Sequence, residues 1–140
     1  MATLYAPSSR TLFSLADTAL GTTLTGPGSS NPGGWNATNQ NARSSLDLRD
    51  VTDVWIAVTA GGASGGAPSL VVNLDLYDDL GNLFPAVAST TALTAAGQQA
   101  VAIGLHTGGT KAQALPAWGR ISWTVGTGSF TGVQIAVFGR

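Results

Sequence analysis

The sequence predicts an all-β fold, namely a single antiparallel β-sandwich or jelly-roll-like domain with an extended N-terminal loop or arm. Three observations support this class. Short apolar runs alternate with a period of two, clusters of Gly, Pro, Asn and Ser separate them, and no amphipathic helix of useful length is found. Glutamate, a strong helix former, is missing from the 140 residues. We expect residues 1–43 to form an N-terminal segment and residues 44–140 the sandwich core.

The N-terminal segment combines one strand pattern with a long polar stretch. The run RTLFSL, residues 10–15, predicts an edge strand. Residues 21–41 are rich in Gly, Pro, Asn, Ser and Thr, a composition typical of a long loop or arm. The run SSLDL, residues 44–48, is where the sandwich is expected to begin.

Residues 51–82 predict two strands, a loop and a turn. Residues 51–60 alternate, which places Val54, Ile56 and Val58 on one face. The Gly-rich sequence GGASGGAPS, residues 61–69, predicts a loop between the strands. Residues 70–77 then predict a half-buried strand with Leu70, Val72, Leu74 and Leu76 on its apolar face and Asn73, Asp75 and Tyr77 on its wet face. The sequence DDLGN that follows supplies a turn.

The remaining segments predict shorter strands and a second hairpin. We expect strands at Ala92–Thr94 and Gln99–Leu105, with a helical turn over residues 89–103 as the alternative. Near the C-terminus, two apolar rows flank the sequence GTGSFTG and predict a β-hairpin with a loop of about five residues. The rows consist of Ile121, Trp123 and Val125, and of Val133, Ile135 and Val137. Residues 55–77 likewise contain a tryptophan-bearing apolar run, a Gly- and Ser-rich stretch and then alternating aliphatic residues. Two similar hairpins are therefore expected in one sandwich.

Charge is scarce along the whole chain. Charged residues make up 9% of the sequence, against roughly 25% in an average globular protein. Such a chain cannot cover itself with ionic side chains, so its surface must be rich in hydroxyls and partly apolar, which predicts assembly with other subunits. The net charge is −1 and the basic residues are scattered, so no nucleic acid is expected as a partner. No apolar run approaches a membrane span and no secretory signal is recognised, so no membrane association is expected.

No catalytic, cofactor or metal site is predicted. His106 lies just after an expected strand without a marked nucleophile, and an ordinary loop residue is the favoured interpretation. Asp75, Asp78 and Asp79 lie close together and could hold a calcium ion, but their spacing does not match an EF-hand loop. Solvated turn residues are therefore favoured. The Gly-rich stretches lack the patterns of phosphate-binding loops, and cysteine is absent.

Aromatic residues are the candidates for contact surfaces. Trp55 and Trp123 lie within strand patterns, so packing in the core or an interface is expected. Trp35 lies in the polar arm and Trp118 just before the last hairpin. Each could stack on a sugar or anchor a protein–protein contact, and the contact is favoured because tryptophan is enriched at interface hot spots. The interface candidates are Trp35, Trp118, Tyr5 and Phe13.

The sequence RISWTVGTGSFTGVQIAVFGR, residues 120–140, with the upstream sequence VWIAVTAGGASGGAPSLVVNLDLYDDLGN, residues 54–82, resembles small virion structural proteins of tailed bacteriophages. The resemblance covers residues 50–140. It implies a head-decoration, or cement, protein: a compact β domain, often trimeric, that clamps neighbouring major capsid subunits. It also implies a location on the capsid surface of the virion after synthesis in the host cytoplasm. Met1–Arg10 and Gly21–Asn41 would be the arms that reach neighbouring subunits.

Two other functions stay open. The same fold could serve as a tail-associated structural subunit of a phage. It could also be a carbohydrate-binding β-sandwich module that uses Trp35 or Trp118. An enzyme is least favoured, because the sequence marks no acid–base pair, nucleophile set or metal cluster.

Overall fold

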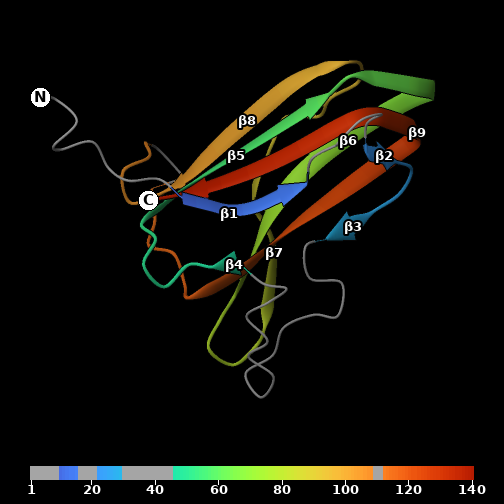
Figure 1. Ribbon diagram of the computed structural model, residues 1–140. Helices are drawn as coiled ribbons and strands as arrows, with labels where there is room; N and C mark the ends of the chain where they lie inside the picture. Colours follow the sequence, from blue (N-terminus) through green and yellow to red (C-terminus); the bar gives the residue numbers. More distant parts are fainter. Residues whose placement is uncertain (1–9, 16–21, 30–45, 109–111) are drawn as a thin grey trace, which may run out of the picture.

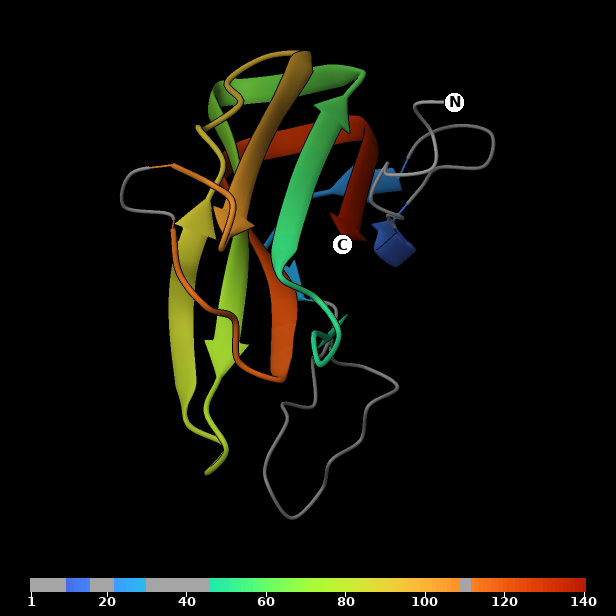
Figure 2. The same cartoon turned by 90° about the vertical axis from the view of Figure 1, so that its left-hand side faces the viewer.

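The computed structural model describes residues 10–15, 22–29, 46–108 and 112–140, and every regular element in these ranges is a β-strand (Figure 1). Within these ranges, nine strands form an antiparallel sheet whose central order is β7-β6-β9-β5-β8. The sheet folds over into two layers and is nearly closed, like a flattened barrel (Figure 2). The predicted class, a single antiparallel all-β domain, is confirmed.

A long two-stranded ribbon organises the domain. Strands β5 (Asp53–Ala60) and β6 (Gly62–Tyr77) are separated only by Gly61, and both pair with β9 (Trp118–Gly139). The pairing runs from Val54 opposite Gly139 to Tyr77 opposite Trp118. The register shifts only between Ser64 and Ala67 and between Ala67 and Leu70. The chain therefore lays β5 and β6 end to end along the whole of β9.

This ribbon folds over at two glycines that face each other. The Gly61 N–H donates to the Thr131 carbonyl at 2.9 Å and to the Gly132 carbonyl at 3.3 Å. Gly132 has a φ of 60°, and a Cβ at this position would lie 3.3 Å from the Gly61 backbone. Glycine is needed at Gly132 because side chains rarely adopt this conformation and the backbones approach closely here. The bend at these glycines places β5 with one half of β9 in the first layer and β6 with the other half in the second layer (Figure 1).

Shorter strands complete each layer. In the first layer, β8 (Gly97–Gly104) pairs with β5, and β1 (Arg10–Leu15) pairs with the C-terminal part of β9. The second layer adds β7 (Leu83–Ser89), which pairs with β6. Strands β2 (Thr22–Leu24), β3 (Gly28–Ser29) and β4 (Leu46–Asp47) pair with β9 in this layer.

The N-terminal segment contributes strands to this sheet. The edge strand predicted at residues 10–15 is confirmed as β1, and β2 and β3 also pair with β9. Most of the expected arms, residues 1–9, 21 and 30–41, lies outside the described residues. Residues 22–24 and 28–29, which the sequence assigned to a loop or arm, are instead strands of this sheet, because their backbone groups pair with β9.

The core lies between the two layers and consists of the inward positions of the ribbon. The inward faces predicted for residues 54–58, for residues 70–76 and for the second apolar row of β9 are confirmed, whereas in the first row Ile121 is fully buried and Trp123 and Val125 are only partly buried against the core. The residues of these patterns with 4% exposure or less are Val54, Ile56, Val58, Leu70, Val72, Leu74, Leu76, Ile121, Val133, Ile135 and Val137. Burial of these aliphatic side chains provides the main driving force for the fold.

Both predicted hairpins are wrong. The sequence GGASGGAPS forms the start of β6 instead of a loop, and GTGSFTG lies inside β9 instead of a turn. The physical reason is that the two Gly- and Ser-rich stretches pair with each other. Ser64 lies opposite Ser129, and their hydroxyl oxygens are 2.8 Å apart. Each stretch thus provides the backbone partners that the other needs.

Other predictions along β6 to β8 are partly corrected. Residues 92–94 do not form a strand, although Leu93 exchanges two backbone hydrogen bonds of 2.9 Å with Leu70. The strand predicted at residues 99–105 is present as β8. Strand β7 was not predicted; it contains Pro85 and a bulge at Ala86, whose φ is 52°, features tolerated at a sheet edge.

Two residues predicted on the wet face of β6 are buried instead. Asp75 and Tyr77 have 2% and 3% of their surface exposed. Asp75 is paired with Arg120 of β9, while Tyr77 packs with Trp118. The Arg120 guanidinium of a distant strand thus makes burial of the Asp75 carboxylate tolerable. The turn predicted at DDLGN is confirmed between β6 and β7.

Candidate functional site

Two of the three aspartates considered for calcium, Asp75 and Asp78, have other roles in the structure. The Asp75 carboxylate accepts hydrogen bonds from Arg120 Nε at 2.7 Å and from the Ala86 N–H at 2.8 Å. Asp78 accepts backbone hydrogen bonds from Leu80 and Asn82, which shape the turn. Within the described ranges, no group of three or more His, Cys, Asp or Glu residues could hold a metal ion. These carboxylates therefore organise the backbone around β6 and β7.

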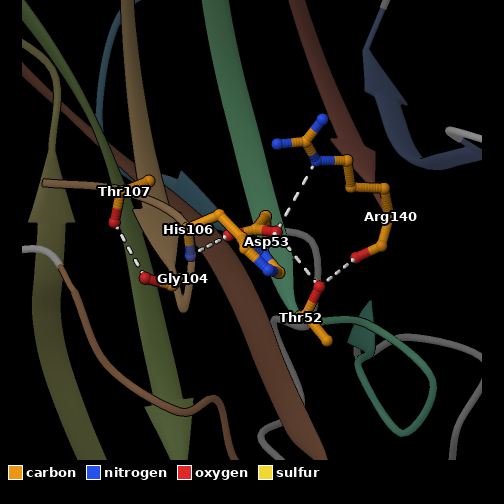
Figure 3. Close-up of polar contacts among 6 residues, drawn as sticks. All are labelled: Thr52, Asp53, Gly104, His106, Thr107 and Arg140. Carbon is orange, nitrogen blue, oxygen red and sulfur yellow. Dashed lines mark hydrogen bonds and ion pairs between the residues drawn. The ribbon is translucent and has the colours of Figure 1, made fainter. Parts of the chain in front are cut away.

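A polar cluster forms around Asp53, where β5 begins (Figure 3). Its Oδ1 accepts a hydrogen bond from the His106 backbone N–H at 2.8 Å. Its Oδ2 lies 2.6 Å from His106 Nδ1, accepts from the Thr52 hydroxyl at 3.0 Å, and lies 3.6 Å from Arg140 Nε. We call Thr52, Asp53, His106 and Arg140 the Asp53 cluster. It joins β5, the loop after β8 and the end of β9.

The environment of Asp53 favours its ionised form. Burial raises the pKa of its carboxyl, but hydrogen bonds from the His106 backbone, the His106 ring and the Thr52 hydroxyl lower it, and the pKa falls from 3.8 to about 2. The carboxylate is therefore charged at neutral pH. Because an ionised carboxylate can only accept hydrogen bonds, the short contact with Asp53 places a hydrogen on Nδ1 of His106.

His106 is more than the ordinary loop residue that the sequence suggested, because its ring and its backbone N–H both contact the Asp53 carboxylate. The pair nevertheless falls short of a catalytic triad. The Thr52 hydroxyl bonds to Asp53 and to the Arg140 carbonyl. Among the residues that the structure describes, no hydroxyl bonds to the other ring nitrogen of His106, as a nucleophile activated by this base would.

A cavity of about 450 Å³ lies beside the Asp53 cluster. Its apolar floor contains Trp55 of β5 and Phe138 of β9, whose ring centroids are 5.8 Å apart and whose planes are inclined by 30°. Ala102 of β8 lies directly across from Trp55. Arg140 and Thr107 are polar members of the lining. Trp55 is 46% exposed, an unusual position for so large an aromatic side chain.

The outer face of the first layer continues this floor without charge. Ala57 lies opposite Ala100 on β8 and Ala136 on β9. Thr59 lies opposite Gln98 and Gln134 further along the same strands. A second hollow of about 350 Å³ includes Trp55, Ala57 and Gln98 in its lining. The small side chains leave Trp55 as the largest group on this face.

A separate apolar surface lies at the turn between β6 and β7. Leu80, Leu83 and Phe84 are 80%, 37% and 53% exposed, and we call these three residues the apolar tip. Asp78 fixes the turn by accepting hydrogen bonds from the Leu80 and Asn82 backbones at 2.9 and 2.8 Å. Beside the tip, a mainly apolar groove of about 350 Å³ is lined by Leu76, Tyr77, Asp78, Phe84, Val87, Gln113 and Pro116. Figures 1 and 2 place this turn away from the C-terminus.

The predicted interface residues occupy different environments. Trp118 is 8% exposed, packs with Tyr77 and lies beneath the Arg49 guanidinium, which is 5.0 Å from its ring centroid. Phe13 is partly buried against the core. Trp35 and Tyr5 lie outside the described residues.

Among the tryptophans that the structure describes, Trp55 is the exposed one, and the sequence predicted for it only packing in the core or an interface. The alternation that buries Val54 and Ile56 also turns Trp55 outward, and this signal could have marked it. The Asp53 cluster had no such signal. Its members come together only because β5, β8 and β9 meet at one end.

The chain matches no protein-family model and no curated protein. Over residues 10–15, 22–29, 46–108 and 112–140, no helix has the length and apolar character needed to cross a bilayer. The two surface features that could bind a partner or a ligand are the apolar tip and the cavity beside the Asp53 cluster.

Proposed function

We propose that this chain is a structural virion protein that decorates and stabilises a bacteriophage capsid by binding across neighbouring major capsid subunits. The observation that carries the proposal is the apolar tip. It exposes Leu80, Leu83 and Phe84 together, in a chain of which only 9% is charged. The sequence resemblance of residues 50–140 to small phage virion proteins supports the same function.

The tip has the properties of a protein-docking element. Exposed leucine and phenylalanine gain about 25 cal/mol for each Å² of apolar surface removed from water. Because Asp78 already holds the turn through three hydrogen bonds, docking costs little additional ordering of the backbone. A decoration protein that binds only the assembled shell stabilises that shell by mass action.

Self-association is part of the proposal. The scarcity of charge is explained if surface is covered both between copies, as a homotrimer, and against the shell. A mass measurement in solution tests this part directly. We expect the mass of three chains at micromolar concentration, and a monomer at every concentration would contradict it.

Binding to purified phage structures tests the function. The full chain is incubated in parallel with undecorated capsids and with isolated tails, and bound protein is measured by co-sedimentation. Saturable binding to capsids and none to tails is expected. Binding only to tails would replace decoration of the head with a tail-associated role, and binding to neither would overturn the proposal.

A further inference from the structure

We propose that the cavity between β5, β8 and the end of β9 binds a carboxylated sugar, with the sugar ring on Trp55 and the carboxylate on Arg140. This inference is independent of capsid binding, because it uses the outer face of the first layer and not the apolar tip. It also differs from the sequence-based suggestion of sugar stacking on Trp35 or Trp118.

Trp55 offers a platform for a ring. Its side chain is 46% exposed and is supported by Phe138, with ring centroids 5.8 Å apart. Ala102, its neighbour across the strands, is small and leaves space above the sheet. The C–H groups on one face of a pyranose carry slight positive charge and match the electron-rich face of an aromatic ring. The cavity volume of about 450 Å³ falls within the range of small-ligand sites.

Arg140 offers the anion-binding group. Its Nε lies 3.6 Å from Asp53 Oδ2, so the contact with Asp53 is made through Nε and not through the two terminal nitrogens (Figure 3). The side chain is 47% exposed, so these nitrogens are open to a ligand. A guanidinium presents its donors as a planar fork that suits a carboxylate.

Asp53 orients this fork instead of contacting the ligand. The carboxylate already accepts from the His106 N–H, the Thr52 hydroxyl and the His106 ring, in addition to its ion pair with Arg140. These partners occupy about all the acceptor sites of a carboxylate. Asp53 is also 7% exposed, whereas Arg140 faces the solvent. The groups left for a ligand are therefore mainly donors beside an apolar floor.

The combination selects the class of ligand. A neutral sugar would cover Trp55 but leave the fork of Arg140 to water. An aspartate or glutamate side chain of a peptide would engage the fork but leave the ring of Trp55 uncovered. A uronic acid or a sialic acid carries the ring and the carboxylate in one residue and uses both groups.

Binding to defined glycans tests the inference. The full chain is applied to an array of carboxylated and neutral glycans, and the strongest carboxylated oligosaccharide is titrated by calorimetry against the same compound with its carboxyls methyl-esterified. We expect binding confined to carboxylated glycans and at least tenfold weaker binding of the ester. If no carboxylated glycan binds, if the ester binds equally well, or if an acidic peptide competes with similar affinity, the inference is wrong.

Variants locate the site. Arg140→Gln and Trp55→Val should each weaken glycan binding at least tenfold, and Arg140→Lys, which keeps the charge but loses the fork, should also weaken it. Arg49→Gln is the matched control, since Arg49 lies over Trp118 and does not line the cavity. Circular dichroism confirms that each variant is folded. Unchanged binding by folded Arg140→Gln or Arg140→Lys would overturn the site, while capsid binding of the same variants should stay unchanged.

Discussion

The Nδ1 atom of His106 lies 2.6 Å from the Asp53 carboxylate and ties the loop after β8 to the first residue of β5. The same carboxylate contacts Thr52 and Arg140. In addition, the Thr52 N–H donates to the Arg140 carbonyl at 2.7 Å. The end of the ribbon at which β5 begins and β9 ends is therefore closed by polar contacts in addition to apolar packing.

These contacts predict a specific pH dependence of stability. The folded-state pKa of Asp53 is about 2 against an ordinary value of 3.8, so its contribution is present above pH 4 and is lost as the pH falls toward 2. Asp53→Asn should lower the free energy of unfolding by about 2 kcal/mol at pH 7. Urea unfolding of both proteins between pH 7 and pH 2 checks this. The gap between them should shrink below pH 4, and a gap independent of pH would contradict the role of the charged carboxylate.

The close approach of the two Gly- and Ser-rich stretches predicts a strongly position-dependent effect of added methyl groups. A Cβ on Gly128, whose φ is 148°, would lie 2.4 Å from the Ser64 carbonyl oxygen. Gly128→Ala should therefore lower the free energy of unfolding by about 2 kcal/mol or more. Gly66→Ala is the control, because nothing lies within 4 Å of the added Cβ there. Equal unfolding midpoints in urea for the two variants would show that these stretches do not pair as described.

The buried ion pair between β6 and β9 predicts non-additive mutational effects. Asp75 is buried, and Arg120 Nε lies 2.7 Å from it. Arg120→Met leaves the Asp75 charge without this partner and should cost about 3 kcal/mol of stability. Combining it with Asp75→Asn should recover part of that loss, because an amide is cheaper to bury than an isolated carboxylate. A double-mutant cycle from chemical unfolding measures the coupling, and strictly additive losses would argue against the pair.

Much of the core could be predicted from the sequence, but the connections could not. The alternation around Ile56, Val72 and Ile135 correctly identified inward faces, because period-two burial is a local property of a strand. Glycine and serine near Ser64 and Ser129 predicted turns, because such residues usually end strands. Here they pair with each other across the ribbon, and no local signal shows a pairing between residues 65 positions apart.

Some residues of the candidate sites could likewise be predicted from the local sequence, while others depend on distant partners. Trp55 could have been placed on the surface from its position between Val54 and Ile56, and the turn at Asp78 was predicted from its composition. The burial of Asp75 depends on Arg120, and the Asp53 cluster depends on residues from three strand ends. These relationships follow from the topology, which the local pattern does not determine.

Capsid co-sedimentation of a tip variant tests the central proposal most directly. The double variant Leu80→Ser/Phe84→Ser removes two exposed apolar side chains, and Leu105→Ser, which changes a leucine that is 54% exposed elsewhere, is the matched control. With folding verified by circular dichroism, the control should bind undecorated capsids like the unmodified chain, while the double variant should bind at least tenfold more weakly. Equal binding of the double variant and the control would contradict docking through the apolar tip.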